Sequence, residues 1–210
     1  MSQINSIEPP DTRERLLLTA ASLMWERSFQ AAGVDELCKR ANIRKGSFYH
    51  FFPSKSDLAI AAIENSWVQA KARIFEPIFS TADSGLNQLR SLIYRVHEFQ
   101  LQLAAEKGLV FGCPFGNLGQ EMALQDERLR NTLQKIFDAH CAYIENALIR
   151  AEQAGEIPEG DNRLRARNIF ALLEGAQLLA KVANDPKVFW YAMSALEVLA
   201  TAKCSNQQSS

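Results

Sequence analysis

The chain lacks the features of a secreted or membrane-bound protein. No stretch of its 210 residues approaches the ~18 uninterrupted apolar residues that a membrane-spanning helix requires. Residues 1–11 contain acids and prolines without an apolar core, so they do not resemble a signal peptide. The sequence therefore predicts a soluble, cytoplasmic protein with no membrane partner.

Cysteine is scarce, and its positions exclude two further classes of protein. The four cysteines, Cys38, Cys113, Cys141 and Cys204, stand far apart and form no CxxC pair. This spacing argues against a disulfide scaffold and against a zinc finger, and it is typical of reduced thiols. We predict no metal and no cofactor. We interpret Cys38 and Cys141 as packing residues and Cys204 as part of a C-terminal tail.

An excess of positive charge is also missing. The 23 lysines and arginines are balanced by 24 acids, which gives a formal net charge of -1. A nonspecific architectural DNA-binding protein is expected to be strongly basic, so this balance argues against that function. Any binding of nucleic acid has to depend on a local cluster of positive charge.

Signals for β-strands are nearly absent, whereas helical periodicity extends over most of the chain. We predict an all-α protein in which three short helices within residues 1–57 form a helix-turn-helix domain. A larger helical domain for ligand binding and dimerisation follows in residues 58–210. Asp11 or Thr12 is expected to cap the first helix. The predicted helices cover residues 12–28, 34–41, 45–52, a segment from Lys55, and residues 86–106, 127–153, 163–183 and a segment from Pro186.

The second and third predicted helices carry a local positive cluster. The window 39–55 holds Lys39, Arg40, Arg44, Lys45 and Lys55 and no acid. Phosphates of DNA require such a cluster, but a solvated basic face on any helical bundle has the same composition. The charge alone leaves both interpretations open.

The order of residues favours DNA binding. Residues 34–58 read VDELCKRANIRKGSFYHFFPSKSDL and closely resemble the signature of the TetR/AcrR family of transcriptional regulators. The resemblance implies a dimer with a three-helix DNA-binding domain and a larger ligand-binding domain. Two positions depart from the pattern. Gly33 stands where a Ser or Thr cap is usual, and Asn42 stands at the usual turn glycine.

The resemblance also implies which residues contact operator DNA. Tyr49 and Lys55 match the family's phosphate contacts, and Lys55 lies at a predicted helix N-terminus. Gly46 is expected to allow close approach of the backbone to the duplex. The positions that reach bases or nearby phosphates are Arg44, Lys45, Ser47 and His50.

The last two predicted helices are the homodimer interface in this family. Two apolar stripes are candidates for it here, with small residues that permit close helix approach. The alternative is that both stripes are ordinary core within one chain. The stripes consist of Ile169, Leu172, Leu173, Ala176, Leu179 and Ala180, and of Phe189, Ala192, Met193, Leu196 and Leu199.

Cys113 directly precedes Pro114, and proline favours the first position of a helix. The sulfur is therefore expected at a helix N-terminus, where the helix dipole favours a reactive thiolate. The segment 111–121 resembles the branch of the family that contains the N-ethylmaleimide reductase repressor, which implies a sensing cysteine. The alternative is a small apolar residue in a pocket wall.

A ligand pocket needs apolar walls with a few polar groups. Most aromatic residues at helical spacing belong to a core instead, and a satisfied core histidine is the alternative for His140. Residues that we predict to line the pocket with Cys113 are Tyr94, Phe99, Phe111, Phe115, His140, Tyr143, Phe170, Glu174 and Gln177.

The sequence thus predicts a DNA-binding regulator, in most cases of this family a repressor, released by a small-molecule or electrophilic inducer. Ligand binding is expected to swing the helix between Lys55 and Ile74. The rival function is a thiol-dependent enzyme with Cys113 as nucleophile, His140 as base and Glu121 as orienting group. Nothing in the spacing brings these three together, so we predict no catalytic residues.

Overall fold

The computed structural model describes residues 11–26 and 28–202, and these residues form helices and connecting turns without a strand. The helices are α1 (Thr12–Glu26), α2 (Val34–Ala41), α3 (Lys45–Phe51), α4 (Lys55–Ala70), the π-helix η1 (Lys71–Phe75), α5 (Glu76–Phe79), α6 (Gly85–Lys107), α7 (Pro114–Met122), α8 (Glu127–Gln153), α9 (Asn162–Ala183), the 3-10 helix η2 (Pro186–Val188) and α10 (Phe189–Thr201).

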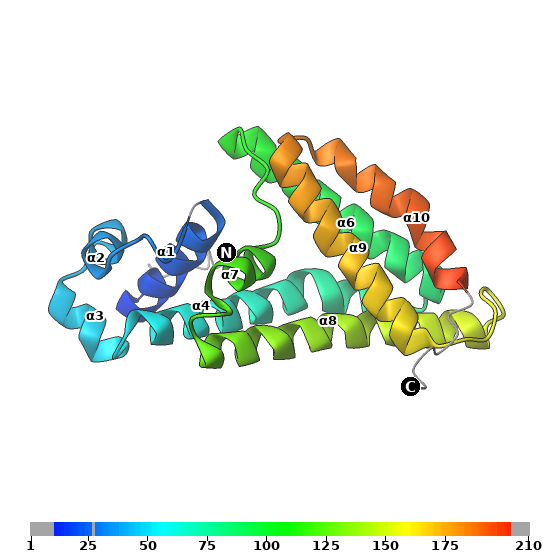
Figure 1. The fold of residues 1–210 in the computed structure, drawn as a ribbon, viewed down its shortest axis with the longest axis horizontal. Coiled ribbons are helices and arrows are strands. Elements are labelled where there is room, and N and C mark those ends of the chain that lie inside the picture. Colours follow the sequence, from blue (N-terminus) through cyan, green and yellow to red (C-terminus); the bar gives the residue numbers. More distant parts are fainter. Residues whose placement is uncertain (1–10, 27, 203–210) are drawn as a thin grey trace, which may run out of the picture.

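The molecule is elongated, with α1, α2 and α3 at one end (Figure 1). Helix α4 leads away from this end and packs along α8, which spans much of the length. Helices α6, α9 and α10 pack together at the other end, and α7 lies between the two ends, against α1 and α8. The predicted all-α class, with an N-terminal helix-turn-helix and a larger helical body, is confirmed.

Side-chain caps set the starts of most long helices. The Asp11 carboxylate accepts a hydrogen bond from the Glu14 amide at 2.7 Å, so Asp11 rather than Thr12 caps α1. Ser54 caps α4 by accepting from the amide of Asp57 at 3.1 Å. Because each cap satisfies an amide that has no partner within its helix, these residues fix where the helices begin.

The N-terminal core continues past the predicted domain boundary at residue 57. Leu58 and Ile63 of α4 are buried in the same hydrophobic cluster as α1, α2 and α3. Leu118 of α7 and Leu133 of α8 belong to this cluster too. A second cluster fills the space between α6, α8, α9 and α10. The N-terminal end of the molecule therefore shares its core with two helices of the body, α7 and α8.

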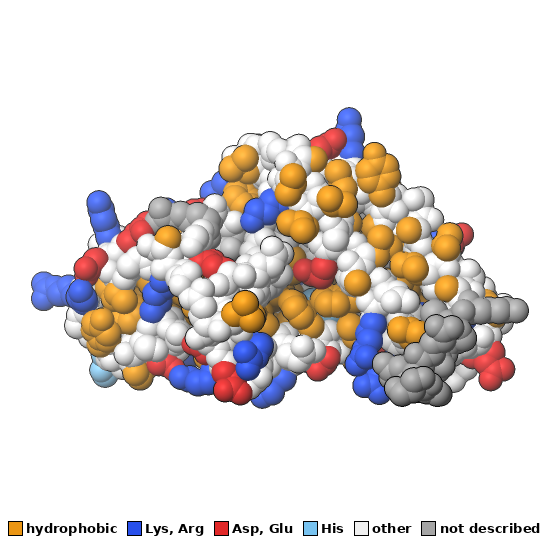
Figure 2. Space-filling view, in the orientation of Figure 1, with side chains coloured by type: hydrophobic (Ala, Val, Ile, Leu, Met, Phe, Trp, Pro, Cys, Tyr) orange, Lys and Arg blue, Asp and Glu red, His pale blue; other side chains and the backbone are white. Residues whose placement is uncertain are grey.

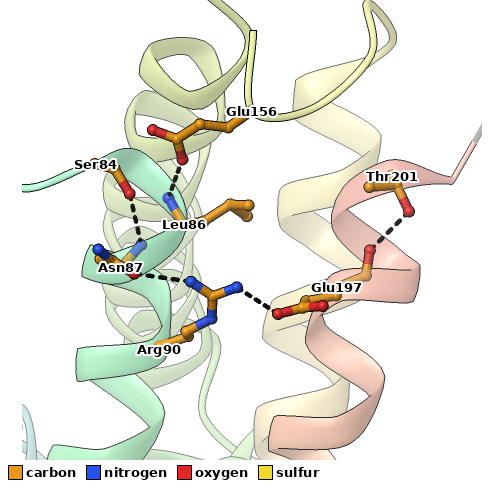
Figure 3. A network of polar contacts seen from close by, with 7 residues as sticks. All are labelled: Ser84, Leu86, Asn87, Arg90, Glu156, Glu197 and Thr201. Carbon is orange, nitrogen blue, oxygen red and sulfur yellow. Dashed lines mark hydrogen bonds and ion pairs between the residues drawn. The ribbon is translucent and has the colours of Figure 1, made fainter. Parts of the chain in front are cut away.

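Polar contacts tie α10 to the body. Arg90 of α6 forms an ion pair with Glu197 of α10 and also donates to Asn87 of its own helix at 2.8 Å (Figure 3). The amide of Leu86 donates to Glu156 at 3.3 Å, which links the start of α6 to the turn after α8. These contacts, with the second core cluster, hold α6, α8 and α10 as one unit.

One feature of the body differs from the prediction. The helix expected from Lys55 to Ile74 is α-helical only to Ala70, because a π-helical turn follows at Lys71–Phe75. Helix α7 begins at Pro114, where the proline predicted a helix start. Cys204 lies outside the described residues. Within residues 11–26 and 28–202, none of the helices combines the length and apolar character that crossing a membrane would take.

Candidate DNA-binding and ligand-binding sites

A short buried core positions the recognition helix α3. Phe48 is fully buried and anchors α3 against α1 and α2, while Leu37 is buried on α2. Between them Asn42 adopts the left-handed conformation (φ 53°), and the amide of Ile43 donates to the carbonyl of Cys38 at 3.0 Å. Asparagine tolerates this conformation, so it replaces the usual glycine of the turn without distorting it.

The predicted DNA contacts of α3 lie together on the surface. Arg44, at the N-cap of α3, and Tyr49 and His50, within it, are exposed. Gly46 is exposed as well, and a Cβ atom built there meets no atom within 4 Å. Lysines and arginines stand out from this end of the molecule (Figure 2). The remaining two predicted residues, Lys45 and the half-buried Ser47, lie on the same helix.

Part of the positive charge here is already paired within the chain. The Nζ of Lys45 lies 2.8 Å from the carboxylate of Asp35, and the hydrogen bond that Lys45 donates to Asp35 raises the pKa of Lys45. Arg40 forms ion pairs with Glu26 and Glu36. These pairs are solvent-exposed and contribute little to stability, so they orient the cations without preventing contact with phosphate.

Lys55 has a different environment from the one predicted. Its Nζ donates to the carbonyl of Gln30 at 2.7 Å and lies 4.8 Å from the ring centroid of Phe29. Burial lowers the pKa of Lys55 below its ordinary value. The Lys55 side chain therefore holds the loop between α1 and α2. Any contact of its ammonium group with a DNA phosphate has to be compatible with the hydrogen bond to Gln30.

The same loop is bound from the other side by Glu121, near the end of α7. Its carboxylate accepts hydrogen bonds from the Ser28 hydroxyl at 2.6 Å, from the Phe29 amide at 3.1 Å and from the Gln30 amide. Gln125, in the turn that follows, is hydrogen-bonded to the Gln30 side chain. Sequence reasoning considered Glu121 only as an orienting group of the enzyme alternative and missed this role.

A cavity of about 1040 Å³ lies beside α7 and is bounded by α1, α4, α6, α8 and α9. Its size suits a drug-sized ligand. Eight of the residues predicted to line a ligand pocket border this cavity: Phe99, Phe111, Cys113, Phe115, His140, Phe170, Glu174 and Gln177.

Two predicted pocket residues, Tyr94 and Tyr143, do not line the cavity. Tyr94 is 48% exposed on the outer face of α6, where a hydrogen bond with Glu98 raises its pKa. Tyr143 packs against Phe75 and Phe79 in tilted arrangements, with ring centroids 5.1 and 5.2 Å away. An aromatic residue on a helix is compatible with a pocket wall, a core or the surface, and only the packing of the helices decides among them.

Cys113 caps α7, as the proline after it predicted. Its Sγ accepts a hydrogen bond from the Gly116 amide at 3.4 Å. The expected thiolate is not favoured, however. Burial, together with the charge of Glu174, raises the pKa of Cys113 well above its ordinary value. The thiol is therefore protonated in this structure, because desolvation outweighs the effect of the helix N-terminus.

Glu174 of α9 brings a carboxyl group to the cavity wall. Burial raises its pKa, and a hydrogen bond with the Cys113 thiol acts in the opposite direction. Gln177, one turn later, donates to Glu174 Oε1 at 3.2 Å. A Cβ atom at Gly116 would come within 2.5 Å of Glu174 Oε2. Glycine at position 116 thus allows the carboxyl group to lie against the start of α7.

His140 of α8 is neutral in this environment. Burial lowers its pKa to about 4. Its Nδ1 lies 2.7 Å from the carbonyl oxygen of Ile136. Since a carbonyl oxygen can only accept, Nδ1 carries the proton and Nε2 is left as an acceptor. His140 thus has a hydrogen-bond partner within its own helix, and its side chain also lines the cavity.

Gln100 is a structural residue of the cavity that the sequence did not reveal. It is buried on α6, and its Nε2 donates to the carbonyl of Gly112 at 3.0 Å. Its Oε1 accepts from the amides of Phe111 and Gly112. This side chain fixes the segment before α7 and so positions Cys113. A lone glutamine within a helical pattern gives no signal for such a role.

The arrangement does not assemble the enzyme site considered as the alternative. Glu121 lies at the far end of α7 from Cys113 and is bound to the α1–α2 loop. Cys113 interacts with Glu174 instead. In the part of the chain that the structure describes, no three His, Cys, Asp or Glu residues are grouped as metal ligands.

The predicted dimer stripes are mostly buried within the chain. Ile169, Leu173 and Ala176 of α9, and Phe189 and Leu196 of α10, belong to the second core cluster. The alternative of intrachain core is therefore correct for them. A neighbouring face of the two helices is apolar and exposed, and hydrophobic side chains gather over it (Figure 2). Its members are Leu178, Leu179, Val182, Tyr191 and Val198, of which only Leu179 was in a predicted stripe.

Both halves of the chain match known family models. Residues 16–62 match the model of bacterial regulatory proteins of the tetR family, and residues 85–196 match the tetracyclin repressor-like C-terminal domain. The chain belongs to the TetR family. It is a DNA-binding transcriptional regulator, and its relatives are regulators rather than enzymes.

Individual relatives extend the match over most of the chain. The HTH-type transcriptional repressor NemR of Escherichia coli is 30% identical over 176 residues, which is 83% of this chain and 86% of NemR. The transcriptional regulator AcuR of Cereibacter sphaeroides is 31% identical over 175 residues, 82% of this chain and 78% of AcuR. The crystal structure of reduced E. coli NemR superposes with a TM-score of 0.79 at 26% identity, covering 93% of this chain and all of that one.

Proposed function

We propose that this TetR family regulator is a homodimeric repressor whose operator affinity falls when a small molecule occupies the cavity. The observation that carries the proposal is the position of α7. Its first residues, Pro114 and Phe115, border the cavity, and Glu121 binds the α1–α2 loop. One short helix therefore contacts both the ligand site and the DNA-binding end.

This arrangement supports a route for coupling. A ligand that displaces the start of α7 also displaces Glu121, because the helix between them is rigid. The loop amides of Phe29 and Gln30 then lose their acceptor. The loop carbonyl of Gln30, to which Lys55 of α4 donates a hydrogen bond, is displaced as well. We expect α4 and α7 to transmit the change together. A coupling of about 1–3 kcal/mol is the usual scale for such effects.

The exposed apolar face of α9 and α10 supports dimerisation through these two helices. Its residues Leu179, Val182 and Tyr191 are 59%, 78% and 73% exposed. An apolar patch of this kind on a regulatory protein is best explained by a partner. A two-fold dimer would present two α3 helices to half-sites about 34 Å apart on a palindromic operator. This role would place the protein in the cytoplasm.

Arg44, Lys45, Gly46, Ser47, Tyr49 and His50 are the proposed operator contacts of this dimer. All but Ser47 are exposed, and all lie on or beside α3. Lys55 is proposed to contribute mainly by holding the α1–α2 loop, with any phosphate contact secondary.

A noncovalent ligand is the first candidate for the inducer. Cys113 lines the cavity, so an electrophile that enters can reach its sulfur. The raised pKa of Cys113 nevertheless keeps the thiol protonated, and the protonated form is the poorer nucleophile. Covalent sensing remains the second candidate, supported by the similarity to NemR, whose solved structure is named as its reduced form.

The test begins with an operator selected from random DNA duplexes, followed by anisotropy titrations with and without candidate ligands. Cys113→Ser and the control Cys141→Ser are compared, because Cys141 does not line the cavity. Release of wild type and both variants by a noncovalent ligand supports the proposal. Release by quinones or N-ethylmaleimide that Cys113→Ser alone abolishes supports the covalent alternative. If saturated protein keeps full operator affinity, ligand-controlled repression is contradicted.

A further inference from the structure

The cavity contains a carboxyl group that has no cationic partner. Among the described residues, Glu174 takes part in no ion pair. Its contacts are with neutral groups, the Gln177 amide and the Cys113 thiol. Lys181, two turns later on α9, donates to Asn117 Oδ1 at 3.1 Å. A largely buried carboxyl group without a compensating charge costs free energy, and a bound cation would remove that cost.

Aromatic rings line the same cavity as this carboxyl group. Phe111, Phe115 and Phe170 line the cavity with Glu174, and the ring of His140 lies 5.5 Å from Phe170 and 5.9 Å from Phe115 between centroids. The faces of aromatic rings carry partial negative charge and attract cations, most strongly where water is excluded. Rings and carboxyl group therefore favour the same sign of ligand charge.

His140 adds an acceptor to the same wall. Because its Nδ1–H is used by the carbonyl of Ile136, its Nε2 lone pair is available to a ligand donor. Burial keeps the imidazole neutral by lowering its pKa to about 4, so the ring does not repel a cation at neutral pH. Two acceptors, one of them a carboxyl group, thus line the same cavity as the rings.

We propose that the cavity is built for a hydrophobic ammonium ligand, with Glu174 as its counter-ion and the Phe111, Phe115 and Phe170 rings around it. This deepens the proposed function and rests on it, since it names the class of inducer. A neutral ligand would leave an ionised Glu174 uncompensated, whereas a cation would stabilise its charged form. Arg73, Arg95 and Lys107 also line the cavity, but they are exposed, so the largely buried Glu174 sets the preferred ligand charge at the inner wall. A protonated amine on an apolar body meets all three features of the wall.

A pair of probes of equal shape tests the charge. 4-Phenylbutylamine is a cation at pH 7.5, and 4-phenylbutan-1-ol is its neutral counterpart. Calorimetry with the full-length wild-type protein should show at least a tenfold tighter binding of the amine. Glu174→Gln should abolish this preference by weakening the amine and leaving the alcohol unchanged. The control Glu98→Gln, at an exposed carboxylate of the cavity rim, should retain it.

Equal binding of the two probes to wild type, or no binding of the amine, would overturn the proposal without needing any variant. A preference that survives in Glu174→Gln would overturn the assignment of the counter-ion. Operator release is measured separately with the same probes. If both probes bind and release DNA equally, ligand-controlled repression stands and the cation inference fails. If the amine binds more tightly than the alcohol but the protein stays on the operator, the cation site is supported and ligand-controlled repression is contradicted.

Discussion

The hydroxyl of Ser28 donates a 2.6 Å hydrogen bond to the carboxylate of Glu121, although 93 positions separate the two residues in the chain. The bond joins the loop before α2 to the last full turn of α7. Together with the amides of Phe29 and Gln30, it connects the DNA-binding end to a helix whose other end borders the cavity.

Glu121→Ala should uncouple the two sites. Three donors of the α1–α2 loop lose their acceptor, and a buried hydrogen bond to a charged group typically contributes a net of about 1.5–3 kcal/mol. Because the loop is partly exposed and water can replace the carboxylate, we expect a loss of about 1–2 kcal/mol in unfolding free energy. We also expect a smaller change of operator affinity on ligand binding than in wild type.

The measurement is urea unfolding combined with operator titrations at zero and saturating ligand. Glu127→Ala is a matched control, because that exposed carboxylate near the start of α8 has an ion pair only with its neighbour Arg130 among the described residues. If Glu121→Ala kept both the wild-type stability and the full ligand response, α7 would not be the coupling element.

Gly46→Ala should separate stability from DNA binding. The new methyl group meets no protein atom within 4 Å, and alanine favours a helix over glycine by up to about 1 kcal/mol, so the melting temperature should stay equal or rise. If the backbone at position 46 approaches the duplex, the same methyl group collides with DNA. Operator affinity is then expected to fall at least tenfold. A stable variant with unchanged affinity would remove Gly46 from the DNA contacts.

The contrast between α2 and Tyr94 shows how far the sequence could predict the structure. The bounds of α2 were predicted correctly, because its apolar residues share one face and Asn42 tolerates the left-handed conformation that ends the helix. Tyr94 was predicted to line the pocket as an aromatic residue and is exposed instead. Spacing identifies residues that share a face, but the packing of several helices decides which face borders a cavity.

The sites divide in the same way. The α3 contacts were predicted because a continuous motif holds them, whereas the Ser28–Glu121 and Gln100–Gly112 contacts depend on tertiary structure. The thiolate expected at Cys113 failed for a related reason. The proline at position 114 predicts a helix N-terminus, which lowers the pKa of a nearby thiol. The sequence does not reveal how deeply Cys113 is buried, and this burial raises its pKa by more.

His140 predicts a specific pH dependence of stability. Its pKa is about 4 in the folded protein and near 6.5 in the unfolded chain. Below about pH 6.5 the unfolded state therefore binds a proton that the folded state does not, and stability falls as the pH decreases toward 4. The full effect is on the order of 3 kcal/mol. Above pH 6.5 His140 contributes no pH dependence.

His140→Phe removes this proton linkage while keeping a ring in the cavity wall. The difference in unfolding free energy between wild type and variant, measured by urea titration from pH 7.5 to 4.5, should shift in favour of the variant as the pH falls. Using the difference cancels the contributions of other groups. A difference that stays constant with pH would show that His140 is not held neutral by burial.

Val182→Glu should produce a monomer. Val182 is 78% exposed on the apolar face of α9, so a charge there costs the folded monomer little. In a dimer the same carboxylate, with its symmetry mate, would be buried in an apolar interface, and that is strongly unfavourable. Sedimentation velocity should show monomer, and operator binding should weaken at least tenfold because one subunit contacts one half-site. Leu124→Glu, in the turn after α7 where the side chain is 98% exposed, is the control and should remain dimeric. A Val182→Glu protein that stays dimeric would place the interface on another face.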